Sequence, residues 1–275
     1  MSAGATLVAE GTADAAATET RTLPAIRLGS VEVSRLILGS NPFFGFAHQP
    51  GGLAKEMQTY YTDERIVAVM DEAASHGITA VASPVYDRWL RLFATYREGG
   101  GRLRHWIAQP DGPAEKMEGE IEAAVKGGAA AVFIQGGRVD EQFGKGNLDL
   151  LRKWVELIKR LGVPAGMASH RPDVHLEAER RGFPTDFYYQ CFYNPVHEAY
   201  RPEDREKAAA ALRRIEKPVV GYKILAAGRL GAEEGFEFAF RHLRRKDGVC
   251  VGMFPKHQPG QIQENADLVR ELSQR

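Results

Sequence analysis

Residues 188–195, Tyr-Tyr-Gln-Cys-Phe-Tyr-Asn-Pro, decide the fold that this sequence predicts. The segment begins as an apolar, aromatic run typical of a buried strand and ends in polar residues before a proline. In a parallel sheet, Gln190, Tyr193 and Asn194 would come at the carboxyl end of that strand. Proteins with such sheets hold their ligands at this end, so the segment predicts both a strand and the edge of a site.

Apolar runs of the same kind recur along the chain and alternate with amphipathic segments of helical period. We expect eight strands, at residues 36–39, 79–82, 105–108, 130–134, 164–168, 187–191, 218–222 and 249–253. We expect helices at residues 63–75, 86–96, 114–126, 148–161, 173–181, 203–215, 232–245 and 261–273. Strands that are apolar throughout and alternate with helices predict an α/β fold, the (β/α)8 TIM barrel.

The N-terminal part of the chain contains two further features. Residues 26–33, with Gly29-Ser30 at the turn, predict a short hairpin before the barrel. Residues 1–22 are rich in Ala, Thr and Gly, and we expect them to form a disordered leader. No linker divides residues 23–275, so we expect a single barrel domain, whose size fits the roughly 250 residues that such barrels need.

The composition argues against several classes of partner. The chain of 275 residues has 36 Lys and Arg against 36 Asp and Glu, so bulk charge favours neither nucleic acid nor a membrane surface. No apolar run approaches the roughly 20 residues of a membrane span. Only two cysteines are present, and we expect a cytoplasmic protein whose partner is a small-molecule substrate. The sequence leaves the oligomeric state open.

In a barrel of this kind, functional side chains follow the carboxyl ends of the strands. The side chains expected there are mostly amides and aromatic rings, which suit a polar or sugar-like ligand. We expect the substrate to contact Asn41, Phe44, Gln109, Asp111, Gln135, Gln190, Tyr193 and Asn194.

Three titratable groups at the same end are candidates for catalysis: Tyr86, His170 and Lys223. A partly buried lysine suits a Schiff base, a general base or an anion clamp, although it could also be neutralised by a carboxylate or extend to the rim. His170 could transfer protons near neutral pH, or simply bond to nearby backbone. The sequence leaves the alternatives for Lys223 and for His170 open.

The histidines of the rim do not predict a metal site. His48, His170, His197 and His257 lie on four different loops, and Asp111 and Glu198 are the only nearby carboxylates that could join them. No closely spaced ligand pair is present, so we expect no bound metal.

Five motifs, in order along the chain, resemble those of the aldo-keto reductases, and together they extend over most of residues 26–272. They are residues 33–40 (Val-Ser-Arg-Leu-Ile-Leu-Gly-Ser), 76–79 (His-Gly-Ile-Thr), 190–195 (Gln-Cys-Phe-Tyr-Asn-Pro), 222–230 (Tyr-Lys-Ile-Leu-Ala-Ala-Gly-Arg-Leu) and 255–256 with 261–265 (Pro-Lys and Gln-Ile-Gln-Glu-Asn). The resemblance implies a barrel that reduces carbonyls with NADPH, through a tyrosine acid tuned by Lys and Asp beside a His.

The resemblance breaks at the catalytic positions. The aspartate, lysine and histidine positions read Ala82, Gln109 and Gln135. Tyr86 could match the tyrosine, although it stands one residue too close to position 82. Without a nearby cation, a phenol of pKa near 10 is a poor acid at neutral pH. The usual hydride-transfer site is therefore not expected.

The cofactor positions are also altered. The Ser-Asn pair after the fifth strand reads Ala168-Ser169, and the arginine position falls near Gln261. If NADP binds, the resemblance implies contacts from Gln190, Lys223, Lys256, Glu264 and Asn265.

Three functions follow as hypotheses. The first is an aldo-keto-reductase-like enzyme that acts on a polar carbonyl- or sugar-like molecule by acid/base chemistry of the lyase or isomerase type. The second is an NAD(P)H-dependent oxidoreductase with a non-standard site. The third is a ligand-binding protein without catalysis.

Overall fold

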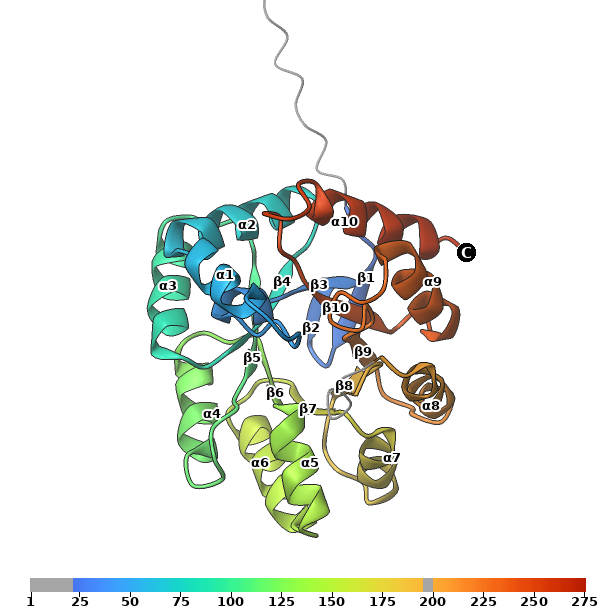
Figure 1. Cartoon of the computed structure of the whole chain (residues 1–275). Coiled ribbons are helices and arrows are strands. Elements are labelled where there is room, and N and C mark those ends of the chain that lie inside the picture. Colours follow the sequence, from blue (N-terminus) through green and yellow to red (C-terminus); the bar gives the residue numbers. More distant parts are fainter. Residues whose placement is uncertain (1–21, 195–199) are drawn as a thin grey trace, which may run out of the picture.

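The computed structural model describes residues 22–194 and 200–275, which form a closed barrel of eight parallel strands ringed by helices (Figure 1). The strands are β3 (Leu36–Gly39), β4 (Ala80–Pro84), β5 (His105–Gln109), β6 (Ala131–Ile134), β7 (Ala165–Ser169), β8 (Phe187–Cys191), β9 (Val219–Tyr222) and β10 (Gly248–Gly252). Neighbouring strands follow the chain order, and β10 pairs with β3 to close the barrel. The predicted (β/α)8 TIM barrel is confirmed.

Eight helices correspond to those expected from the sequence. They are α2 (Asp63–Ser75), α3 (Asp87–Glu98), α4 (Met117–Lys126), α6 (Leu148–Arg160), α7 (Pro172–Arg180), α8 (Pro202–Leu212), α9 (Ala232–His242) and α10 (Gln261–Leu272). Their ends carry ordinary signals: the Thr62 side chain accepts a hydrogen bond from Arg65 N at the start of α2, at 3.3 Å. None of the described helices is long and apolar enough to cross a membrane.

Three helical segments were not predicted from the sequence, and all lie at the carboxyl end of the barrel. The 3-10 helix η1 (Asn41–Phe44) and helix α1 (Leu53–Tyr60) follow β3, and α5 (Gly136–Gly144) follows β6. The Gly-Gly pair that opens α5 is typical of a turn. The Gln135 side chain overrides this preference, because its Oε1 accepts from Arg138 N at 3.0 Å and caps the helix.

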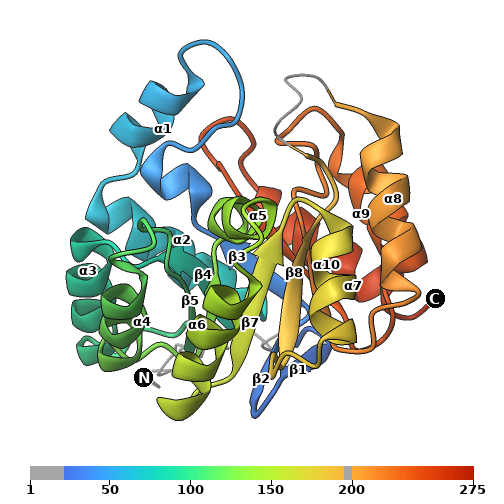
Figure 2. The same cartoon turned by 90° about the horizontal axis from the view of Figure 1, so that it is seen from below.

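The predicted hairpin is present as β1 (Ala25–Leu28) and β2 (Val31–Ser34). It covers the end of the barrel opposite to α1, as Figure 2 shows. Ile26, Leu28 and Val33 of the hairpin are buried against the apolar interior of the barrel. Among the described residues, the hairpin therefore closes this end of the barrel.

Side chains of unequal size fill the barrel interior. Phe133 and Tyr189 stack at 4.0 Å between ring centroids, nearly parallel, and occupy much of the middle layer. Ala82 and Ala168, on the same inner face, are too small to fill the space above these rings. Together the four residues line the floor of a cavity at the carboxyl end. The packing that stabilises the barrel thus also sets the depth of this cavity.

A buried histidine of α7 makes the stability of this fold sensitive to pH. His175 is fully buried, its Nε2 lies 3.1 Å from Tyr189 O, and burial lowers its pKa to about 4. Between pH 6.5 and 4 the unfolded chain therefore binds a proton at this residue that the folded chain does not.

We expect the contribution of His175 to the free energy of unfolding to be fully present above pH 6.5. Protonation of this residue in the unfolded chain should lower the free energy of unfolding by up to about 3 kcal/mol as the pH approaches 4. Urea unfolding at pH 7 and pH 5 measures the loss. His175→Gln keeps a donor toward Tyr189 O but does not titrate, so its stability should vary less with pH. An equally steep dependence in this variant would contradict the assignment.

Candidate active site

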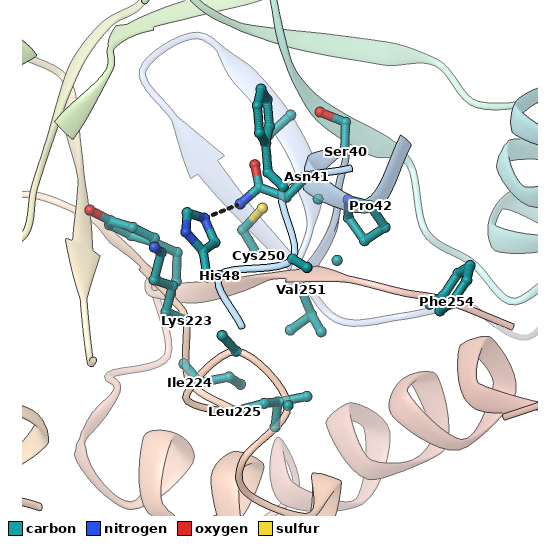
Figure 3. Close-up of a pocket in the computed structure, with 18 of the residues that line it drawn as sticks. Ser40, Asn41, Pro42, His48, Lys223, Ile224, Leu225, Cys250, Val251 and Phe254 are labelled. Atoms are coloured by element: carbon teal, nitrogen blue, oxygen red, sulfur yellow. Dashed lines mark hydrogen bonds between the residues drawn. The ribbon is translucent and has the colours of Figure 1, made fainter. Parts of the chain in front are cut away.

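A cavity of about 780 Å³ opens at the carboxyl ends of the strands. Its wall comes from the segment after β3 and from the loops after β5, β6, β7, β9 and β10 (Figure 3). Six of the residues expected at the site from the sequence line it: Asn41, Gln109, Asp111, Gln135, His170 and Lys223. The lining also includes polar side chains that were not proposed as site residues, among them Tyr222, Cys250, His48 and Gln49.

His170 is held by a carboxylate of the neighbouring helix. Asp140 of α5 lies with its Oδ2 2.7 Å from His170 Nδ1, and the same oxygen accepts from His170 N at 3.1 Å. The other oxygen accepts from the Ser169 hydroxyl, so both carboxylate oxygens are occupied. The His170 and Asp140 side chains are 14% and 19% exposed.

This arrangement fixes the chemistry of the imidazole. A carboxylate beside Nδ1 favours the tautomer with its proton on that atom, which leaves Nε2 to accept or donate a proton. The ring also lies against Tyr222, with centroids 5.7 Å apart. Within the described residues, the His170 ring is thus bonded to a side-chain carboxylate, Asp140, and not to nearby backbone. Asp140 was not predicted as a site residue, because its helix was not predicted.

Lys223 enters the cavity from a strained loop. Its backbone is left-handed, with φ of 55°, and Ala226 and Ala227 in the same loop have φ of 47° and 56°. Such angles are unfavourable for residues other than glycine and are found where the surrounding structure imposes them. Because β9 ends at Tyr222, this turn lets Tyr222 and Lys223 both line the cavity, although consecutive strand residues point to opposite faces.

The surroundings of Lys223 favour the neutral amine. Burial lowers the pKa of Lys223, and the positive charge of Arg229 lowers it further. The thiol of Cys191 is close, but burial raises its pKa to about 12, so it carries no charge at neutral pH. Among residues 22–194 and 200–275, the Lys223 side chain has no hydrogen-bond or ion-pair partner.

His48 lies beside Lys223 at the same wall, as Figure 3 shows. Enclosure by the cavity, followed by the charges of Lys223 and His170, lowers its pKa to about 4. The imidazole is therefore neutral at pH 7, and its Nε2 lies 3.3 Å from Asn41 Nδ2. An environment that disfavours a further cation favours the opposite charge, so this wall suits a ligand oxygen that carries or develops negative charge.

Tyr86 is paired with a carboxylate instead of a cation. Its hydroxyl donates to Asp111 Oδ2 at 2.6 Å, and Phe44 packs edge-on against its ring at 5.2 Å. Burial and the Asp111 carboxylate raise the pKa of Tyr86 above its ordinary value. The phenol is thus a weaker acid than free tyrosine, which is the reverse of what proton donation to a carbonyl requires.

The other residues expected from the sequence do not line the cavity: Phe44, Tyr86, Gln190, Tyr193, Asn194, Lys256, Glu264 and Asn265. Gln190 is fully buried and its Nε2 donates to Cys191 O at 2.9 Å. Strand alternation explains this placement, because Tyr189 and not Gln190 is on the inner face of β8. Pro195, His197 and Glu198 lie outside the described residues.

The described residues do not fit a nicotinamide cofactor that transfers hydride to a carbonyl. Tyr86 is engaged by Asp111, and Lys256, one of the expected phosphate contacts, pairs with Glu56 at 2.7 Å. Gln261, at the arginine position, accepts from Phe254 N at 2.6 Å through its Oε1. Within the described chain, no group of three or more His, Cys, Asp or Glu is arranged to hold a metal ion.

Two of the solved structures that share this fold are similar over most of their length. One, named "putative aldo-keto reductase from Pseudomona aeruginosa", matches with a TM-score of 0.64 and 16% identity over 92% of this chain and 98% of the other. A second with that name matches with a TM-score of 0.60 and 17% identity over 92% and 99%. No family model and no curated protein matches this sequence. The predicted resemblance to aldo-keto reductases is thus confirmed as a likeness of fold.

The positions of Tyr222 and His170 depend on the absence of a side chain at Gly136. A Cβ there would lie 2.9 Å from Tyr222 Oη and 3.2 Å from His170 Cε1. We expect Gly136→Ala to displace these rings. If the cavity is an active site, turnover should fall by about 10-fold or more, since small displacements of groups that contact a substrate are costly.

Gly144, at the other end of α5, has open space around its Cβ position and supplies the matched control. Gly144→Ala should leave turnover unchanged. Steady-state rates and thermal melting of both variants measure the effect, and equal rates for the two variants would show that the contact with Gly136 does not position the site.

Proposed function

We propose that this chain is an enzyme that acts on a small, polar carbonyl compound, such as a hydroxylated aldehyde, ketone or sugar, by acid/base chemistry of the isomerase or lyase type. The observation that carries the proposal is the Asp140–His170 pair, which presents one imidazole nitrogen to a cavity that also contains Lys223. The likeness of fold and the five sequence motifs support descent from an aldo-keto-reductase-like barrel.

In this mechanism His170 Nε2 removes a proton from the carbon next to the substrate carbonyl. The electrons of the broken C–H bond move to the carbonyl oxygen, which becomes an enolate. Asp140 stabilises the imidazolium that forms and keeps the ring in place. For a substrate with a hydroxyl on that carbon, the hydroxyl proton passes to the enolate oxygen. Return of the carbon-bound proton from His170 to the former carbonyl carbon then completes the isomerisation, with the carbonyl moved to the neighbouring carbon.

The wall that Lys223 and Asn41 form would stabilise the enolate oxygen. The Lys223 amine and the Asn41 amide can donate hydrogen bonds where the negative charge develops, and such stabilisation is a large part of catalysis in enclosed sites. The Gln109 amide, at the end of β5, can bond to substrate hydroxyls. These roles depend on a cavity wall that is polar and has few carboxylates.

The proposal includes the cellular compartment in which the protein acts. Both cysteines of the chain, Cys191 and Cys250, are free. Unpaired thiols suit a reducing compartment, and we propose that the protein acts in the cytoplasm on a diffusible small molecule.

Exchange of substrate protons tests the proposal whatever the final product is. The protein is incubated in D2O with a panel of hydroxylated aldehydes, ketones and sugars, and loss of the proton next to the carbonyl is followed by NMR. We expect exchange with at least one compound, and a loss of about 100-fold or more in His170→Asn, as for removal of a general base.

His76, at the end of α2, lies outside the cavity wall, and His76→Asn is the matched control that should retain exchange. Absence of exchange with every compound, or equal exchange in the His170 and His76 variants, would refute the proposal. So would turnover of the same compounds that consumes NADPH in proportion to product.

A further inference from the structure

We propose that Lys223 binds the carbonyl substrate covalently, as a Schiff base between its Nζ and the carbonyl carbon. This inference rests on the proposed function and narrows it. The substrate would be a hydroxylated aldehyde or ketone, and the reaction would pass through an iminium ion, as suits aldol cleavage or condensation. Lys223 would then be the nucleophile, and His170 would move the protons.

The first support is the state of the amine. A lysine attacks a carbonyl only when it is deprotonated, and lysines that do so are held in desolvated sites or beside other cations. Lys223 meets both conditions, since it is partly buried and Arg229 is close. Within the part of the chain that the structure describes, no carboxylate neutralises it.

The second support is a comparison with Lys217, another lysine whose pKa is lowered by burial. Lys217 Nζ donates to Phe183 O at 2.7 Å and to Thr185 Oγ1 at 2.9 Å, and Lys217 does not line the cavity. Hydrogen bonds within the protein thus account for the burial of the Lys217 side chain. Lys223 has a comparable environment without these contacts, and it lines the cavity.

The third support is the backbone. The left-handed angles at Lys223, Ala226 and Ala227 are unfavourable relative to ordinary conformations. Glycine would adopt them without that cost. A loop that holds three such residues keeps the start of the Lys223 side chain in one place, as a nucleophile beside a fixed base requires.

The chemistry balances without any further reagent. The lone pair of Lys223 Nζ forms a bond to the carbonyl carbon while the carbonyl oxygen takes a proton. The resulting hydroxyl leaves as water after a second protonation, and the nitrogen, which has lost one of its protons, becomes a positively charged iminium. His170 Nε2 then accepts a proton from a substrate hydroxyl, a C–C bond breaks, and its electrons move to the iminium nitrogen to give an enamine.

Two observations support a base within reach of this adduct. His170 and Lys223 line the same cavity, from the segments that follow β7 and β9. The neutral His48 adds no positive charge to a site that must hold an iminium. The role of Lys223 as a clamp for an anionic ligand is the alternative outcome of the test.

Trapping with borohydride tests the inference. The whole chain is incubated with dihydroxyacetone or glyceraldehyde, reduced with sodium borohydride, and analysed by intact-mass and peptide mass spectrometry. We expect one adduct per chain, at Lys223, that adds the mass of the probe less one oxygen atom. Lys223→Arg, which keeps the positive charge, should lose the adduct completely, whereas Lys217→Arg should keep it.

Thermal melting of both variants establishes that they fold. Adducts spread over many lysines, or none at Lys223, would overturn the inference. If His170-dependent proton exchange persists in Lys223→Arg at the wild-type rate, the proposed function is supported and the covalent step is refuted. If the adduct forms but exchange does not depend on His170, the covalent step is supported and the proposed function is refuted.

Discussion

The bond between the Asp140 carboxylate and the end of β7 is the interaction on which the candidate site depends. One oxygen accepts from Ser169, and the other meets both the ring and the backbone of His170. A carboxylate that is mostly buried must be satisfied in this way, because leaving its oxygens unpaired would be costly. The same contacts attach α5 to the barrel and set the direction of the imidazole, so local stability and the proposed chemistry have one physical origin.

The cavity around this pair results from differences in side-chain size and from a strained loop. Aromatic rings of β6 and β8 fill the middle of the barrel, and alanines of β4 and β7 leave space above them. At the rim, the loop after β9 adopts left-handed angles at three residues and turns Lys223 inward. The strain at this loop reduces stability, as does an amine without a partner among the described residues, and both occur where the ligand would bind.

Much of the fold was predictable from the sequence, because it is determined by local patterns. Apolar runs and the signals at helix ends located all eight strands and eight of the helices. The site was predictable in part: the strand ends placed His170 and Lys223 in the cavity. Asp140 was missed because its helix starts with two glycines and is capped by Gln135, and its partner lies 30 residues away. Gln190 was placed on the wrong side of β8, because a run apolar on both faces does not reveal which residues point inward.

The orientation of His170 by Asp140 is the central claim, and NMR of the His170 ring nitrogens tests it most directly. When the His170 ring is neutral, Nδ1 should carry the proton and Nε2 should be unprotonated. In Asp140→Asn, whose amide can donate to Nδ1, the proton should move to Nε2 while the protein stays folded. A proton on Nε2 in the unmodified protein, or the same tautomer in both proteins, would contradict the account.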